Sequence, residues 1–413
     1  MCDQELAEAL ASAGAVLIEG PKWCGKTRTA SKAAASVLYM QDPDQATNYL
    51  SLADAKPSLL LKGETPRLID EWQMAPVLWD AVRFTVDQRG EMGQFILTGS
   101  AVPADGVTAH TGTGRFARIS MRPMSLFESG ESAGSVSLRS LFNGCHDLDC
   151  ISTLTIEQIA FSICRGGWPA AVLRGDQTSL RMSRDYVESV IQQDISRVDG
   201  VEKNPDRVRL LLRSLARNIG TTASIHTILE DVESSDISIS DKTISAYLNA
   251  LRRIFVIEDL PAWLPSIRSK TAIRSTPKRH FTDPSIATAV LRMNPEGILG
   301  DFNTFGFLFE SLCTRDLRVY AQSIDADVFH YRDKNGLEAD LIVRLRDGRW
   351  GAIEVKLGQK QIDEAARHLL ALQARVDEDK MGAAAFLMVI TGGQYAYRRA
   401  DGVLVVPIGC LRD

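Results

Sequence analysis

The chain has 413 residues, of which 45% are hydrophobic and 24% are charged, and this composition excludes a disordered or fibrous protein. A chain of this length predicts about two to three domains, because a single hydrophobic core does not grow that large. The formal net charge of −5 excludes a general attraction to nucleic acids or membranes, so any basic surface must be local.

The cysteines and the N-terminal residues indicate in which cellular compartment the protein is expected. Seven cysteines are scattered without a C-x-x-C pair, which predicts free thiols in a reducing compartment. Cys145, His146 and Cys150 form the one cluster that suggests a metal, and we favour free side chains there. The N-terminus lacks a basic region followed by an apolar stretch, and no apolar run approaches the roughly 20 residues of a membrane span. We therefore expect a cytoplasmic protein with no membrane partner.

A short helix over residues 5–13 precedes the most informative stretch of the chain. Residues 15–19 are an apolar run that predicts a strand, and residues 20–27 follow with the pattern G-x-x-x-x-G-K-T. The glycines let the backbone turn its N–H groups inward, and a helix is expected to begin at Lys26 and to continue over residues 29–37. Such a loop binds ATP or ADP, with Lys26 on the β- and γ-phosphates and the Thr27 hydroxyl on Mg²⁺. The predicted nucleotide-binding residues are Gly20, Pro21, Lys22, Trp23, Cys24, Gly25, Lys26, Thr27 and Arg28.

A brief apolar strand within residues 67–73 is predicted next, and it ends in adjacent carboxylates. Ligands bind parallel sheets at the carboxyl ends of their strands, so Asp70 and Glu71 are placed for the same site as the loop. We assign Asp70 to Mg²⁺, directly or through water, and Glu71 to the attacking water as general base. The alternative is an exposed acidic turn.

Two further predictions concern groups that would act on the γ-phosphate. A third apolar strand, residues 94–100, ends in hydroxyl groups, and Thr98 or Ser100 could bind the γ-phosphate or the attacking water. Ser and Thr are also common at strand ends without any such role. Beyond it, Arg115 and secondarily Arg118 are candidates for an arginine that contacts the γ-phosphate, in the same chain or from a neighbouring copy in a homo-oligomer. Ordinary surface arginines are the alternative.

Several motifs in this order resemble one family. They are the loop at residues 20–27, Asp70-Glu71-Trp72-Gln73, Leu97-Thr98-Gly99-Ser100, Gly114-Arg115-Phe116, Arg122-Pro123-Met124-Ser125 and Gly166-Gly167-Trp168-Pro169. Together they resemble the bacterial and archaeal AAA-type ATPases that carry a C-terminal domain of unknown function with nuclease-like character. The resemblance implies an α/β fold with a five-stranded P-loop core, a helical lid, a winged helix and an α/β tail, and it implies ATP hydrolysis.

Helical periodicity continues after the first domain. Residues 151–199 are expected to form the lid, interrupted where Gly166, Gly167 and Pro169 cannot continue a helix. Helices over 207–219, 224–232 and 240–251, a strand from residue 254 and then a basic hairpin predict a winged helix. The basic residues of this hairpin are Arg268, Lys270, Arg274, Lys278 and Arg279. DNA is the expected partner of such a layout, and a protein contact is the alternative.

The last part of the chain carries a second group of candidate residues. Glu310 lies in an apolar helix over residues 302–317, Asp340 in a strand over 336–343, and Glu354 and Lys356 in a strand over 350–356. This arrangement resembles nucleases of the PD-(D/E)xK class, with Ala339 in place of the proline. In that resemblance the three carboxylates hold one or two Mg²⁺ ions, and Lys356 orients water or offsets phosphate charge.

The register of the two strands tests this interpretation. A two-residue turn at Asp347-Gly348 would put Glu354 on the wrong face, as in an ordinary hairpin with exposed charges. A three-residue loop with Gly348 in the left-handed conformation sets Asp340 opposite Glu354, with Lys356 on the same side. The functional interpretation therefore predicts the three-residue loop.

A helix over residues 361–372 and strands over 385–390 and 403–407 close the sequence. The expected division is a P-loop core over 1–150, a lid over 151–204, a winged helix over 205–295 and a nuclease-like, restriction-endonuclease-like α/β domain over 296–413. We expect an AAA-type protein that binds and hydrolyses ATP and acts on or with DNA. The alternative is an ATP-dependent switch or scaffold that remodels a protein partner and has an inactive C-terminal domain.

Overall fold

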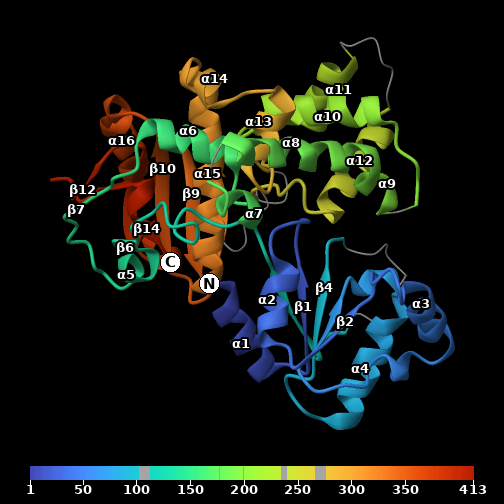
Figure 1. The fold of residues 1–413 in the computed structure, drawn as a ribbon. Helices are drawn as coiled ribbons and strands as arrows, with labels where there is room; N and C mark the ends of the chain where they lie inside the picture. Colours follow the sequence, from blue (N-terminus) through green and yellow to red (C-terminus); the bar gives the residue numbers. More distant parts are fainter. Residues whose placement is uncertain (102–111, 176, 199, 234–239, 266–275) are drawn as a thin grey trace. The chain divides into compact units, whose positions relative to one another are not determined.

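The computed structural model of the chain describes residues 1–101, 112–175, 177–198, 200–233, 240–265 and 276–413 (Figure 1). It forms two compact units. The first unit comprises Met1–Pro123, Gln192–Lys203 and Leu248–Val256, and the second comprises Met124–Ile191, Asn204–Tyr247 and Ile257–Asp413. The boundaries differ from the four consecutive segments expected, because both units are built from separate stretches of the chain.

The first unit contains a five-stranded parallel sheet in the order β2-β3-β4-β1-β5, drawn in blue and cyan in Figure 1. Its strands are β1 (Ala15–Glu19), β2 (Ser36–Tyr39), β3 (Arg67–Asp70), β4 (Phe95–Gly99) and β5 (Phe116–Ser120). Its helices are α1 (Cys2–Ser12), α2 (Lys26–Ala33), α3 (Ala46–Ala55), α4 (Val77–Arg89) and α9 (Ile195–Arg197), with 3-10 turns η1 (Pro57–Leu59) and η2 (Trp72–Met74). The expected five-stranded α/β core is confirmed.

Both faces of this sheet are covered. Along β1, Ala15 and Leu17 enter one hydrophobic core, whereas Val16 and Ile18 enter the core on the other face. This explains why the strand reads as a continuous apolar run. The helix expected over residues 29–37 was too long, because α2 ends at Ala33 and residues 36–39 form the edge strand β2.

Residues 124–150 belong to the second unit, although the P-loop core was expected to extend to residue 150. The reason is strand pairing over a long distance in the sequence. Strand β6 (Val136–Ser137) pairs with β14 (Leu411–Arg412), and β7 (Cys150–Ile151) pairs with β12 (Tyr395–Arg398). The strands β6, β7 and β14 have only two residues each, too few for a sequence period that could reveal them.

The helical part of the second unit follows the expected elements closely. Its helices up to residue 299 are α5 (Leu138–Phe142), α6 (Ile156–Arg165), α7 (Pro169–Val172), α8 (Leu180–Ser189), α10 (Pro205–Arg217), α11 (Ile225–Glu233), α13 (Pro284–Leu291) and α14 (Pro295–Leu299). As predicted, the chain breaks at Gly166-Gly167, where a Cβ on Gly167 would lie 2.1 Å from the Met124 carbonyl oxygen. Helix α13 packs on α6, α8 and α10 alike, so the segments expected as lid and winged helix share one core.

The described residues include only part of the expected wing. Helix α12 (Asp241–Arg253) completes the three predicted helices, with its last residues in the first unit. The strand expected from residue 254 does not start there, since Phe255 has a φ of 58°. Only two antiparallel bridges follow in the described residues, Ile257 with Phe281 and Leu260 with Lys278. The predicted basic residues Arg268, Lys270 and Arg274 lie outside the described residues.

The C-terminal half of the second unit is a seven-stranded mixed sheet in the order β7-β12-β13-β11-β10-β9-β8. Besides β7 and β12, its strands are β8 (Ala326–Arg332), β9 (Glu338–Leu345), β10 (Trp350–Lys356), β11 (Phe386–Thr391) and β13 (Leu404–Pro407). Helices α15 (Phe302–Ser323), α16 (Ile362–Arg375) and α17 (Glu378–Met381) accompany it, and α15 and α16 both pack on β9 and β10 (Figure 1).

The predicted register of β9 and β10 is confirmed. Arg344 pairs with Trp350 and Leu341 with Ile353, so one further step sets Asp340 opposite Glu354. The N–H of Leu345 donates to the carbonyl oxygen of Arg349 at 2.9 Å, which closes a loop of three residues, and Gly348 has a φ of 97°. In the described part of the chain, no helix is long and apolar enough to span a membrane.

Candidate functional site

The phosphate-binding loop follows the carboxyl end of β1, and its backbone explains the glycine spacing. Gly25 has a φ of 106° directly before α2 begins at Lys26. Gly20 lies so close to the end of β5 that a Cβ there would be 2.1 Å from the carbonyl oxygen of Met121. Trp23 also has a positive φ, 67°, and its side chain is exposed. The loop and the following helix therefore have the expected geometry of an anion site.

Lys26 is buried, and its ammonium is held by the loop itself. Its Nζ donates to the carbonyl oxygens of Gly20 at 2.9 Å and Pro21 at 2.7 Å, with Cys24 Sγ at 4.0 Å. Phosphate oxygens are stronger acceptors for an ammonium than neutral carbonyls. Phosphate oxygens of a bound nucleotide could therefore replace these two carbonyl oxygens as acceptors for the Lys26 ammonium.

Asp70 gathers three donors at the end of β3. Its Oδ1 accepts a hydrogen bond from Thr27 Oγ1 at 2.8 Å and another from Thr98 Oγ1, and its Oδ2 accepts from Gln41 Nε2 at 2.7 Å. Thr27 and Asp70, which the sequence predicted as the Mg²⁺ residues, are therefore adjacent. The sequence missed Gln41, since no motif marks a residue that follows an edge strand.

Glu71 directly follows β3 in the left-handed conformation, with a φ of 58°. Its Oε2 accepts hydrogen bonds from Ser100 Oγ at 3.1 Å and from Gln73 Nε2. The hydroxyl groups of Thr98 and Ser100 thus bind the two carboxylates. The prediction that they bind the γ-phosphate or water directly differs from this arrangement, in which they orient Asp70 and Glu71.

A second residue of the loop forms an ion pair that sequence reasoning missed. Lys22 Nζ lies 2.6 Å from Oδ1 of Asp194, whose side chain is only 8% exposed. Asp194 ends a short π-helical turn, Val190–Asp194, and is 172 positions away from Lys22. No local pattern could have connected these two residues.

The two arginine candidates lie at different positions relative to the loop of their own chain. Arg115 directly precedes β5, which runs parallel to β1 with Phe116 opposite Ala15. It therefore lies at the amino ends of the strands, whereas the loop follows the carboxyl end of β1. Its Nε donates to Asp87 Oδ1 at 2.8 Å. Arg118 lies beside Glu19, 3.4 Å away, and over the Trp79 ring. This position of Arg115 does not favour a role within its own chain, and a role on a neighbouring copy stays a prediction.

The second predicted group of residues also comes together. Asp340 of β9, Glu354 and Lys356 of β10 and Glu310 of α15 converge, and Lys356 Nζ lies 3.2 Å from Asp340 Oδ2 and 2.6 Å from Glu354 Oε2. A fifth residue, Lys278, joins them with its Nζ 2.7 Å from Glu310 Oε1 and 3.2 Å from Asp340 Oδ1. We call these five residues the carboxylate–lysine cluster. Lys278 was expected on an exposed basic hairpin but is only 6% exposed.

Burial and mutual charge set the protonation of the carboxylate–lysine cluster. Burial, together with the charge of Asp340, raises the pKa of Glu310 to about 7 and that of Glu354 to about 8. Burial also acts to raise the pKa of Asp340, but the ammonium groups of Lys278 and Lys356 outweigh it and hold this pKa below its usual value. Asp340 is therefore the carboxyl group of the cluster that stays ionised at neutral pH.

The second predicted DNA contact, Arg279, is also buried. Its guanidinium lies 2.9 Å from Asp259 and donates to the carbonyl oxygen of Ala223. The two described residues of the expected basic hairpin thus face the protein interior. Their prediction as DNA contacts is corrected, because their positive charges are used in internal ion pairs.

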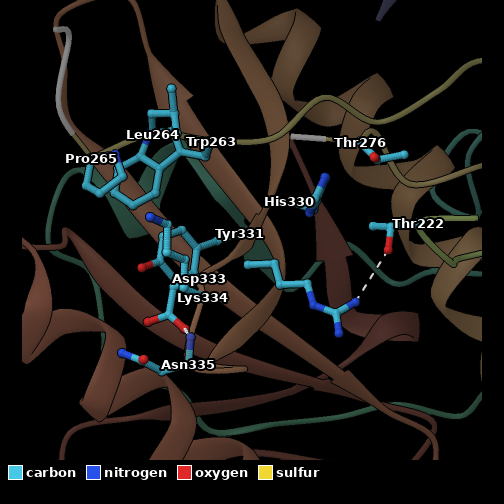
Figure 2. A pocket seen from close by; sticks show the side chains of 11 residues that line it. Thr222, Trp263, Leu264, Pro265, Thr276, His330, Tyr331, Asp333, Lys334 and Asn335 are labelled. Atoms are coloured by element: carbon cyan, nitrogen blue, oxygen red, sulfur yellow. Dashed lines mark hydrogen bonds between the residues drawn. The ribbon is translucent and has the colours of Figure 1, made fainter. Parts of the chain in front are cut away.

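The second unit also contains a cavity of about 570 Å³ beside β8 (Figure 2). It is lined by Thr222, Trp263, Leu264, Pro265, Thr276, His330, Tyr331, Arg332, Asp333, Lys334 and Asn335. Arg332 donates to Thr222 Oγ1 across it at 3.4 Å, the dashed line on the right of Figure 2. None of the site residues predicted from the sequence lines this cavity.

Comparison with known families supports the assignment of the first unit. Residues 12–129 match the family described as AAA domain, which supports ATP binding and hydrolysis by this part of the chain. Residues 156–297 and 305–411 match two families described as domains of unknown function, DUF8612 and DUF4143. The first of these spans both the expected lid and the expected winged helix.

Among curated proteins, the chain is similar to uncharacterized protein Rv2008c of Mycobacterium tuberculosis and uncharacterized protein Mb2031c of Mycobacterium bovis. Each is 24% identical over 409 residues, covering 97% of this chain and 82% of the relative. Among solved structures, the Walker-type ATPase PABY2304 of Pyrococcus abyssi gives a TM-score of 0.44 at 14% identity, covering 70% of this chain and 94% of that one. A RuvB variant of Thermotoga maritima gives 0.30 at 16% identity, covering 63% and 88%.

Proposed function

We propose that the first unit binds ATP on the loop of residues 20–28 and hydrolyses it with Glu71 as the general base. The observation that carries this proposal is the convergence of Lys26, Thr27, Asp70 and Glu71 at the carboxyl edge of one parallel sheet. Lys26 leaves the carbonyl oxygens of its loop and binds the β- and γ-phosphates. Glu71, oriented by Ser100, accepts a proton from the attacking water.

The residues at this edge fit Mg²⁺. A hydroxyl and a carboxylate oxygen lie 2.8 Å apart at Thr27 and Asp70, and oxygen ligands of this kind are those that Mg²⁺ prefers. When bound, the ion neutralises charge on the β- and γ-phosphates. Thr27 would hold it directly, and Asp70 directly or through water, while Thr98 and Gln41 fix the orientation of Asp70.

Two variants separate binding from hydrolysis. Lys26→Ala should abolish ATP binding measured by a fluorescent nucleotide, whereas Glu71→Gln should keep binding and lower turnover by about 100-fold or more. Lys32→Ala, an exposed lysine on the same helix, and Glu64→Gln, an exposed glutamate, are matched controls that should behave as the original protein. Equal turnover in the Glu71 variant would remove the base assignment.

For the role of this ATPase, we favour an ATP-dependent switch or scaffold that acts on a protein partner over one that acts on DNA. The support is the burial of Lys278 and Arg279, whose charges carried much of the DNA prediction. Measuring the ATP turnover of the unmodified chain with and without single- and double-stranded DNA tests this choice. We expect turnover to stay unchanged, and stimulation by either DNA would restore the DNA-dependent role.

A further inference from the structure

The carboxylate–lysine cluster lies where the resemblance to nucleases implies one or two Mg²⁺ ions, yet its carboxylates already hold a cation. From the geometry we infer that the ammonium of Lys278 occupies the cation position between Glu310 and Asp340, and that the C-terminal domain binds no divalent metal there. The cluster takes no part in the proposed ATP hydrolysis. A cluster without this metal does not cleave nucleic acid by a metal-dependent route.

The contacts of Lys278 leave little freedom for a metal. Its Nζ is 2.7 Å from Glu310 Oε1 and 3.2 Å from Asp340 Oδ1, so one ammonium bridges carboxylates from α15 and β9. An Mg²⁺ ion would need oxygen ligands at about 2.0–2.1 Å in octahedral geometry. It could not bind both of these oxygens while the ammonium stays between them.

Two further oxygens of the cluster are also engaged. Asp340 Oδ2 accepts a hydrogen bond from the Val355 N–H at 2.9 Å and another from Lys356 Nζ at 3.2 Å. Glu354 Oε2 lies 2.6 Å from the same Lys356 ammonium. In the described part of the chain, no three His, Cys, Asp or Glu side chains are arranged to hold a metal ion. The donor set therefore does not fit Mg²⁺.

The charges lead to the same result. Three carboxyl groups face two ammonium groups in a site where every member except Lys356 is buried. A divalent ion added to this set would leave a net positive charge away from water, and an unpaired charge in a protein interior is strongly unfavourable. Lys278 must leave before such an ion can enter.

Lys278 is held in place by its backbone. Its N–H donates to the Leu260 carbonyl oxygen at 3.0 Å, and its own carbonyl oxygen accepts from the Leu260 N–H at 2.9 Å. The carbonyl oxygen of the next residue, Arg279, accepts a hydrogen bond from the N–H of Gly220 at 2.8 Å. Gly220 is itself close to the cluster, since a Cβ there would lie 3.6 Å from Glu310 Oε2. The ammonium is therefore fixed by the paired segments at 260 and 278, and it ties them to α15 and β9.

Binding of Mn²⁺ to the full chain without nucleotide, followed by electron paramagnetic resonance, tests this inference. Every protein carries Asp70→Asn so that the first unit does not contribute. The protein with Lys278 intact should show no Mn²⁺ binding that depends on the cluster. Lys278→Met, which keeps the length of the side chain but removes its charge, should bind Mn²⁺ at least about tenfold more tightly. Adding Asp340→Asn to Lys278→Met should abolish that gain.

Lys360→Met, at an exposed lysine, is the matched control and should not gain binding. The inference is overturned if the protein with Lys278 intact binds Mn²⁺ and loses it on Glu354→Gln, or if Lys278→Met gains no binding while remaining folded. If Lys278→Met does not fold, the decision rests on the intact protein alone. Saturable Mn²⁺ binding that competes with Mg²⁺ would then contradict the inference, and its absence would support it.

Discussion

The ion pair between Lys22 and Asp194 links the phosphate-binding loop to a segment far along the chain. Lys22 is 42% exposed, so solvent weakens the pair, but its ammonium is close to the loop that would hold the phosphates. Asp194 and an anionic nucleotide would then compete for one positive charge. Asp194 is in this view a positioning residue that opposes nucleotide binding.

Replacing Asp194 should therefore tighten ATP binding. In Asp194→Asn the Lys22 ammonium is released from its carboxylate, and affinity for ATP should rise by about two- to fivefold, the range expected for a solvent-screened pair. Titration with a fluorescent ATP analogue measures this directly. Asp3→Asn breaks an exposed ion pair with Lys32 and serves as the control, with no expected change. Weaker binding in Asp194→Asn would show that the pair supports the binding conformation.

His330 lines the cavity of Figure 2 and gives the second unit a dependence on pH. Burial lowers its pKa from 6.5 to about 4, with the positive charges of Lys278 and Arg332 adding to the effect. The imidazole of His330 therefore takes up a proton near pH 6.5 in the unfolded chain and only near pH 4 in the folded chain. Between these values the unfolded state holds more protons, so folding stability is lost as the pH falls.

Between pH 6.5 and pH 4, we expect the titration of His330 to lower the free energy of unfolding by about 3 kcal/mol, calculated from the shift in its pKa. Other groups titrate nearby. His280 is also buried with a lowered pKa and acts in the same direction, whereas Glu310 and Glu354, whose pKa values are raised, lose stabilisation as the pH rises. The difference between the original protein and His330→Gln isolates the one histidine.

Urea unfolding of both proteins at pH 6.5 and pH 4 measures this difference. His330→Gln should lose less stability between the two pH values than the original protein, because its side chain does not titrate. His368→Gln, at an exposed position on α16, should follow the original protein. An equal loss in the original protein and in His330→Gln would mean that His330 is hydrated and charges freely in the folded state.

At the scale of elements, local chemistry explains which parts could be predicted from the sequence. Gly348 permits the left-handed residue that closes the loop after β9, and that loop length alone sets Asp340 opposite Glu354. The P-loop was predictable for the same reason, since Gly25 permits the left-handed turn directly before α2 begins at Lys26. Each of these predictions depends on neighbours in the sequence.

Features that depend on distant residues were missed or misassigned. Lys278 reads as part of an exposed basic run, yet pairing with Leu260 turns it toward carboxylates 32 and 62 positions further on. Asp194 is not part of any sequence motif that would predict its ion pair with Lys22. The first stretch of the first unit ends at Pro123 because short strands near residues 136 and 150 pair with the C-terminal strands. Such long-range pairings leave no period in the sequence.

At the scale of the whole molecule, the position of Arg115 bears on assembly. It lies at the amino ends of the parallel strands, whereas the loop, Asp70 and Glu71 lie at their carboxyl ends. Its side chain is 46% exposed and is held by Asp87 alone among acidic groups in the described residues. An arginine in this place can complete a nucleotide site only on another copy of the chain, where it would stabilise charge on the γ-phosphate.

If Arg115 acts on a neighbouring copy, two inactive variants should restore each other. Arg115→Ala keeps an intact loop, and Lys26→Ala keeps an intact arginine, so a mixed pair contains one complete site. For randomly mixed dimers this gives about a quarter of the original turnover, because half of the pairs are mixed and each has one of two sites. Turnover is measured for each variant alone and after mixing, over a range of protein concentrations. Arg83→Ala, another arginine that pairs with Asp87, is the control and should keep its turnover. Full turnover of Arg115→Ala alone, or no recovery on mixing while both variants remain folded, would exclude a contribution of Arg115 from a neighbouring copy.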